Sequence, residues 1–248
     1  MGTDRLRVGL LALTAVSGTV DAVSFLALGH IFTANMTGNV VFLAFAAAGA
    51  PEISVARSIT SLVAFLSGAV IGGYLARATT GPIRHHWLHL AATCEAALLF
   101  AAAIAVIALG GDPTALQDRQ YAVIVLLAVA MGLRTATVQQ LVVPGLTSTT
   151  MVTMTLTGLV ADLALAGSIH SHSGRRVASI TSLFIGAAMG ALLLRLGLAV
   201  PLIVAGVCVV AATAYAAPRR NLSIGGRDRQ ESEDRQAPLQ IVLAHRAG

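Results

Sequence analysis

The feature that most constrains this chain is a series of long apolar runs. A helix needs roughly 20 apolar residues to cross the hydrocarbon core of a bilayer, and several runs approach or exceed that length. Only 11% of the 248 residues are charged, whereas a soluble domain carries about a quarter. The sequence therefore predicts an all-α, polytopic integral membrane protein of about six to eight helices. Its expected partner is the lipid bilayer. The first run continues through Leu28 without a cleavage site, so we expect a retained helix rather than a signal peptide.

The formal net charge of +5 does not indicate nucleic-acid binding. The arginines fall between apolar runs and in the C-terminal tail, as orientation signals do, and no basic face with interleaved aromatic residues is present. The stretch 218–248 mixes arginines with acids and has few apolar residues, which predicts a disordered tail. Arg219 and Arg220 directly follow a helix, which favours a cytoplasmic C-terminus, and we expect the N-terminus to be cytoplasmic as well.

Two short polar stretches, Thr33–Asn39 and Thr153–Gly158, interrupt the apolar sequence. Both read Thr-x-(Asn/Thr)-(Met/Leu)-Thr-Gly. Hydroxyls, amides and a glycine at membrane depth are costly unless they line a cavity or satisfy an interrupted backbone. Two copies in corresponding places point to a transport site between two halves of the chain.

The candidate site combines these polar residues with ionisable residues inside apolar runs. The expected substrate-binding residues are Asp21, Asn35, Thr37, Gly38, Asn39, Arg134, Thr155, Thr157, Gly158 and Asp162, with Glu95 as a charge partner. Hydroxyls and amides can replace the hydration of a small solute or ion, and an intramembrane charge needs a partner or water. The alternative is that these groups bond their own helix or hold helices together.

An internal duplication accompanies the two polar stretches. Ser58–Leu62 recurs letter for letter as Ser179–Leu183, and each copy leads into a Gly-x-x-x-Gly and then an arginine. We expect a transmembrane domain over 1–217, with one repeat at about 8–109 and the other at about 121–217.

Two topologies follow from whether the polar stretches span the membrane. If they span, each half has four helices and the repeats are parallel; if they are re-entrant, each half has three and the repeats are inverted. As helix, Thr33–Gly49 would reach about 25 Å, close to the roughly 30 Å core, which favours spanning but broken segments. The parallel arrangement predicts that Arg134 contacts Asp21, and the inverted one that it lies nearer Glu95.

No pattern in the sequence indicates an enzyme, a metal site or a cofactor. Nucleophile elbows, phosphate loops and zincin helices are missing. We expect His85, His86 and His89 to be solvated loop residues rather than metal ligands. Cys94 and Cys208 lie inside apolar runs, so each is expected to be a buried packing residue without a disulfide.

Several short blocks give the chain a resemblance to a known family. They are Gly18-x-x-Asp21-Ala22, Phe32 with Met36-Thr37-Gly38-Asn39, Val143-Pro144-Gly145-Leu146-Thr147, and Thr155-Leu156-Thr157-Gly158 with Asp162. On these residues the chain resembles the YoaK-like family of bacterial integral membrane proteins, over about 8–217. The resemblance implies a multi-pass inner-membrane protein and brings no established substrate or site residues.

The sequence thus predicts a small-solute or ion transporter or channel in the cell membrane, with a polar site between two repeats. The alternative is a membrane interaction or assembly protein in which the same polar residues only hold helices together. A homo-oligomer is compatible with either. The two hypotheses differ in whether a polar cavity reaches the polar stretches.

Overall fold

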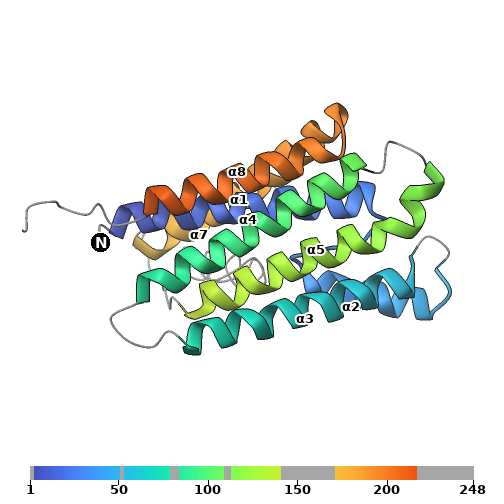
Figure 1. Cartoon of the computed structure of the whole chain (residues 1–248), viewed down its shortest axis with the longest axis horizontal. Helices are drawn as coiled ribbons and strands as arrows, with labels where there is room; N and C mark the ends of the chain where they lie inside the picture. The colour runs from blue at the N-terminus through green and yellow to red at the C-terminus, as the bar shows by residue number, and fades with distance from the viewer. Residues whose placement is uncertain (1–2, 51–52, 79–83, 109–112, 141–170, 217–248) are drawn as a thin grey trace, which may run out of the picture. The chain divides into compact units, whose positions relative to one another are not determined.

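The computed structural model describes residues 3–50, 53–78, 84–108, 113–140 and 171–216, and the structural statements below concern these residues. They belong to the unit Met1–Ala216, and the tail predicted to be disordered, 218–248, lies outside the described residues. The elements are α1 (Thr3–Ala27), α2 (Met36–Ala47), α3 (Val55–Ala78), α4 (Arg84–Ala108), α5 (Pro113–Gln140), α7 (Ser171–Leu193), the short 3₁₀ helix η2 (Leu194–Leu196) and α8 (Ala199–Ala216) (Figure 1).

Six of these helices, all except α2 and η2, are long and apolar enough to cross a membrane. The described part of the chain contains helices and no strand, as an all-α membrane protein requires. The predicted fold class is therefore confirmed. The second helix, α2, has 12 residues, which as helix reach only about 18 Å.

The connector after α1 and the helix α2 bring the chain back to the end of the bundle where α1 stops, instead of crossing the membrane. Gly29, just after α1, lies against the side chain of Arg57 near the start of α3. Asn39 of α2 contacts Ser61 of α3, and Figure 1 shows α1 and α3 running in opposite directions. The expectation that Thr33–Gly49 spans the bilayer is therefore wrong. An apolar run of this length fits a crossing or a return equally well, so its length could not decide between them.

Helices α1 and α7 pack in parallel, with glycines at the contact. Gly18 lies against the backbone of α7 near Leu183, and Gly186 of α7 lies against the backbone of Ala15. One turn further along both helices, Gly190 meets Thr19. No Cβ would fit at Gly18 or Gly186 without moving backbone, as in membrane helix pairs built on small residues.

Helices α3 and α5 form a second parallel pair of the same kind. Gly68 of α3 lies against the backbone of Val129, and Gly72, one turn later, lies against Leu133. From the other side, Gly132 of α5 fits against the backbone of Phe65. The two glycines of each Gly-x-x-x-Gly therefore contact a helix of the other half of the sequence.

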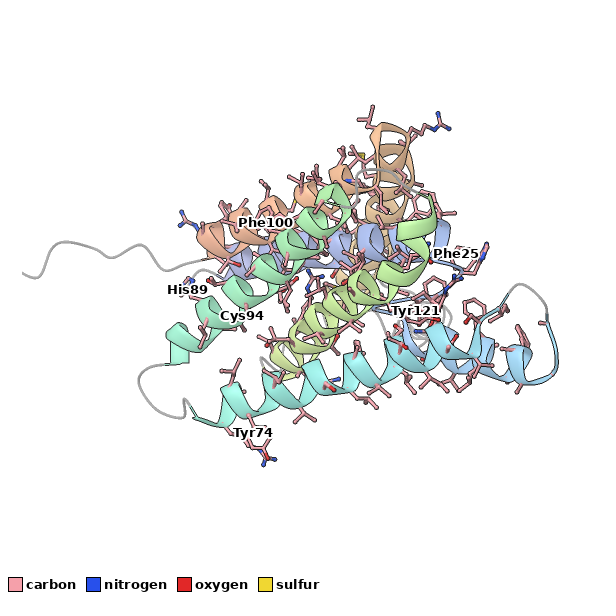
Figure 2. All side chains as sticks on the ribbon, turned by 45° about the vertical axis from the view of Figure 1, so that its right-hand side comes forward. Phe25, Tyr74, His89, Cys94, Phe100 and Tyr121 are labelled. Atoms are coloured by element: carbon pink, nitrogen blue, oxygen red, sulfur yellow. The ribbon has the colours of Figure 1, made fainter. Side chains whose placement is uncertain are left out.

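The core lies among α1, α4, α5 and α8, where Val20, Leu99, Leu127 and Leu202 are fully buried. The remaining faces of α3 and α7 expose large apolar side chains, as surfaces in contact with lipid do. Figure 2 shows Tyr74 projecting away from α3.

Two local expectations differ from the structure. Cys94 is half-buried and Cys208 is exposed, and both thiols are free. In a bilayer a small thiol is as well accommodated by acyl chains as by a packed core, so an apolar run does not show which face it occupies. The histidines expected in a loop lie in α4, which begins at Arg84.

Candidate functional site

The connector between α1 and α2 turns back along the bundle and carries the first polar stretch. Gly29 (φ 93) and His30 (φ 58) adopt the left-handed conformation that ends a helix. The ring of Phe32 then stacks against Phe25 and Phe42, with its centroid 5.2 and 5.6 Å from theirs, and these two rings also contact each other. Figure 2 places Phe25 at the end of the bundle where α1 stops. The aromatic stack fixes the connector against both helices that it joins.

Asp21 of α1 holds the inner end of this connector. Its Oδ1 accepts hydrogen bonds from the backbone N–H groups of Thr33 (3.0 Å) and Ala34 (2.7 Å). Asp21 is only 9% exposed and Thr33 is fully buried. Away from water, an unpaired backbone donor costs several kcal/mol, about the amount that makes irregular structure rare at membrane depth. The carboxylate therefore provides partners that a regular helix would have provided.

Asn39 of α2 performs the same role for Phe32. The N–H of Phe32 donates to Oδ1 of Asn39 (2.8 Å), and Nδ2 of Asn39 donates to the Phe32 carbonyl. The hydroxyl of Ser61 in α3 donates to the same carbonyl (2.7 Å) and accepts from Nδ2 of Asn39 (3.2 Å). Asn39 is 1% exposed. These bonds tie α2, α3 and the connector together.

Arg134 of α5 forms a buried ion pair with Glu95 of α4. Its Nη1 also donates to the carbonyl of Leu13 (2.7 Å) and the hydroxyl of Ser17 (2.8 Å), both on α1. Arg134 is 6% exposed and Glu95 3%. This is the contact that the re-entrant arrangement predicts, and it replaces the Asp21–Arg134 contact expected for spanning segments.

The guanidinium of Arg134 is not fully satisfied. Its Nε is buried and has no hydrogen-bond partner among the described residues. The buried hydroxyl of Ser58 in α3 also has no hydrogen-bond partner among the described residues. Such groups are uncommon, and an ordered water or a ligand is a frequent explanation.

Three charged groups thus form one cluster among α1, α4 and α5. Arg134 pairs with Glu95 and bonds to Ser17, one helical turn before Asp21 on α1. The cluster contains two carboxyl groups and one guanidinium, so it carries one unit of excess negative charge when all three are ionised. Such a cluster can exchange a proton or pair with a polar or cationic solute.

The other expected site residues of the first half lie in or beside α2. Asn35 is at the N-cap position and makes no capping hydrogen bond with its side chain. Thr37 is exposed at the start of the helix, and Gly38 lies against the ring of Phe32. Those of the second half fall outside the described residues: Thr155, Thr157, Gly158 and Asp162.

Sequence reasoning missed two residues of this arrangement. Ser17 precedes Asp21 by one helical turn, so it shares its face of α1. Ser61 belongs to the repeated Ser-Ile-Thr-Ser-Leu block, where it counted only as evidence for duplication. Both spacings were visible in the sequence. The described residues hold no group of three or more His, Cys, Asp or Glu side chains placed to bind a metal ion.

Comparison with known proteins gives two matches. A family model described as "Protein of unknown function (DUF1275)" matches residues 9–215. The UPF0700 transmembrane protein YoaK of Bacillus subtilis (strain 168) is 33% identical over 155 residues. That match spans 62% of this chain and 65% of the relative. No solved structure matches. The predicted resemblance to a YoaK-like membrane family is confirmed.

Proposed function

The chain belongs to the DUF1275 family of proteins of unknown function, and we propose that it is a small-solute or ion transporter with a polar site between two related halves. The observation that supports this proposal most is the cluster of Asp21, Glu95 and Arg134, buried beside an interrupted segment. A charged side chain at the bilayer centre costs about 2.5–3.5 kcal/mol even on lenient scales. Interrupted helices with charged neighbours are typical of transporter sites.

We further propose that the two halves are inverted repeats, and that helices of one half pack in pairs against helices of the other half. Gly18 and Gly132 would be equivalent, as would the Gly-x-x-x-Gly pairs of α3 and α7. Support comes from the parallel pairs α1–α7 and α3–α5, which use these glycines in the same way. Figure 1 shows α1 and α5 running in opposite directions, as inversion requires. In such transporters one repeat moves against the other around a fixed site.

The distribution of arginines supports one orientation. The end of the bundle where α1 begins carries Arg5, Arg7, Arg77, Arg84, Arg175 and Arg176. The opposite end carries Arg57, Arg119 and Arg195. Short cytoplasmic segments are enriched in Lys and Arg. We therefore propose a multi-pass inner-membrane protein whose N-terminal end is cytoplasmic. From the sequence patterns alone, we also propose that it has no enzymatic activity.

The alternative function, a membrane interaction or assembly protein, has an observation of its own. Asp21, Asn39 and Ser61 all bond to backbone groups of the connector, which is how polar residues act when they only maintain a fold. Thr14 and Ser67 bond to their own helix. The buried Nε of Arg134 favours transport, because a buried donor without a hydrogen-bond partner is often explained by an ordered water or a ligand.

Solute flux through the purified protein tests the proposal. The full chain is reconstituted in liposomes on a solid-supported membrane, and a panel of amino acids, sugars, organic acids and inorganic ions is applied. We expect a current or uptake for at least one member, reduced at least tenfold in Glu95→Gln and unchanged in Ser67→Ala. The control removes a hydroxyl that bonds only to its own helix. A folded protein that moves none of the panel contradicts transport.

A further inference from the structure

We propose that Asp21 and Glu95 together bind one proton, and that this proton is the ion that drives the proposed transport. The second part of this inference rests on the proposed function, whereas the proton site itself does not. The argument uses the number of charges in the cluster, their positions along the bundle and the hydrogen bonds of Asp21.

The charges of the cluster do not balance. Within the described spans, only Asp21, Glu95 and Arg134 bear a carboxyl or guanidinium group more than one turn from a span end. Of these three groups, Glu95 and Arg134 form an ion pair with each other. With all three ionised, one carboxylate would remain without a counter-charge in a low-dielectric interior, which is unfavourable. One bound proton removes this excess.

In the part of the chain that the structure describes, the neighbouring elements bring no other counter-charge near the cluster. Helix α8, packed on α1 and α4, contains no charged residue. Helix α7, packed on α1, has arginines only in its first turns, and Arg195 follows it in η2. The cations of α3, Arg57 and Arg77, lie near its two ends. The segment α2 contains no ionisable side chain, and Asp162 falls outside the described residues.

The two carboxyl groups occupy different levels of the bundle. Asp21 precedes the end of α1 at Ala27 by six residues, about 9 Å of helix. Glu95 follows the start of its span at Leu88 by seven residues, about 10 Å from the opposite end. Each carboxyl group is therefore nearer to a different side of the membrane, and Arg134 lies at the level of Glu95, where it reaches Leu13 and Ser17 of α1.

Arg134 can serve either acid. In this structure it pairs with Glu95 and reaches Ser17, one turn from Asp21. Its buried Nε is an unused donor within the cluster. When a proton binds Glu95, an O–H bond forms and the ion pair is lost, so the guanidinium is released toward ionised Asp21. When the proton leaves Glu95 and another binds Asp21, Arg134 pairs with Glu95 again, as in this structure.

The proton would also control the connector. Asp21 accepts the N–H groups of Thr33 and Ala34, and hydrogen bonds to an ionised carboxylate are roughly twice as strong as those to a neutral group. Protonation of Asp21 therefore weakens its hold on the interrupted segment. This connects proton binding to movement of α2, the element that begins beside the exposed Thr37.

Infrared spectroscopy of the full chain in nanodiscs tests the proton site without any transported solute. A protonated carboxyl group gives a C=O stretching band distinct from that of a carboxylate. At pH 7 solvent-exposed acids, with pKa values of about 4, do not contribute. We expect one band in the wild type, no band in Asp21→Asn or Glu95→Gln, and two in Arg134→Gln. Ser67→Ala, the matched control, should keep the single band.

The outcomes separate the proton site from transport. A wild type without the band, or a band that persists in both Asp21→Asn and Glu95→Gln, overturns the proton site. Stabilisation by NaCl but not by choline chloride, with the band absent, would assign the cluster to sodium and overturn it as well. The band together with uptake that follows an imposed pH gradient supports both parts. A band without flux supports the proton site and contradicts transport. Flux without a band supports transport and contradicts the proton site.

Discussion

Asn39 binds both backbone polar groups of Phe32, seven residues earlier in the chain. An amide side chain offers a donor and an acceptor in the same geometry as a backbone peptide, so Asn39 replaces the partner that a neighbouring turn of helix would supply. Phe32 lies in the connector, where regular helix is interrupted. The contact gives hydrogen-bond partners to backbone groups of the polar stretch that no regular helix satisfies.

Replacing Asn39 should therefore destabilise the fold strongly. Asn39→Leu keeps a similar volume but leaves the buried N–H of Phe32 without a partner, which costs about 1–3 kcal/mol. We expect a lower midpoint in thermal unfolding followed by size-exclusion chromatography. Asn35→Leu is the matched control, because the Asn35 side chain makes no capping hydrogen bond. Equal midpoints for the two variants would contradict the role given to Asn39.

The ion pair predicts unequal effects for its two partners. Arg134→Gln leaves two buried carboxyl groups without a guanidinium, whereas after Glu95→Gln the guanidinium still bonds to Ser17, one turn from the Asp21 carboxyl group. Breaking a buried pair from one side costs about 3–5 kcal/mol when the remaining charge finds no partner. We expect Arg134→Gln to reach that range and Glu95→Gln to cost distinctly less, measured by denaturant unfolding in detergent micelles.

A control for this prediction removes both charges. The double variant Glu95→Leu with Arg134→Met should recover most of the stability, because apolar replacement of a buried pair is often neutral. If Glu95→Gln is the more damaging single change, Asp21 does not share the guanidinium.

Two glycines in α3 with different surroundings, Gly68 and Gly73, allow a test of the close helix contact. A Cβ at Gly68 would run into the backbone of Val129, whereas a Cβ at Gly73 meets nothing within 4 Å. Gly73→Ala should stabilise the protein by about 0.5–1 kcal/mol, because alanine restricts the unfolded chain and favours helix. Gly68→Ala should destabilise it by forcing α3 and α5 apart. Thermal midpoints measured side by side decide this, and a tolerated Gly68→Ala would mean that the helices are not in backbone contact.

The sequence predicts much of this architecture because apolar length and charge have few interpretations at membrane depth. The helical class, the break at Gly29 and the dependence of Arg134 on an acid follow from the high cost of unpaired polar groups in lipid. The direction of the segment after Phe32 does not follow, because the mostly apolar run that comes after it can return as easily as it can continue. Asn39 illustrates the limit: its residue type indicates a polar contact, while its partner, the Phe32 backbone, is fixed only by the turn-back of the connector.

The turn-back predicts which side of the membrane each end of α2 faces. His30 and Ala48 are exposed residues on either side of the connector and α2, and Gly174 lies near the start of α7. In a Cys94→Ala, Cys208→Ala background, single cysteines are placed at these positions and treated in intact cells with a membrane-impermeant maleimide. We expect His30→Cys and Ala48→Cys to react from the same, outer side, and Gly174→Cys to react only after the cells are opened.

The labelling experiment is decided by whether His30→Cys and Ala48→Cys react from the same side of the membrane. A segment that crossed the bilayer would place the two positions on opposite sides, so only one would react in intact cells. A segment that returns leaves both on one side, whichever way the protein is inserted. Gly174→Cys then reports the orientation separately, since α7 begins at the end of the bundle where α1 begins (Figure 1). Opposite labelling of His30→Cys and Ala48→Cys would contradict the re-entrant connector, and with it the inverted arrangement on which the proposed transport cycle depends.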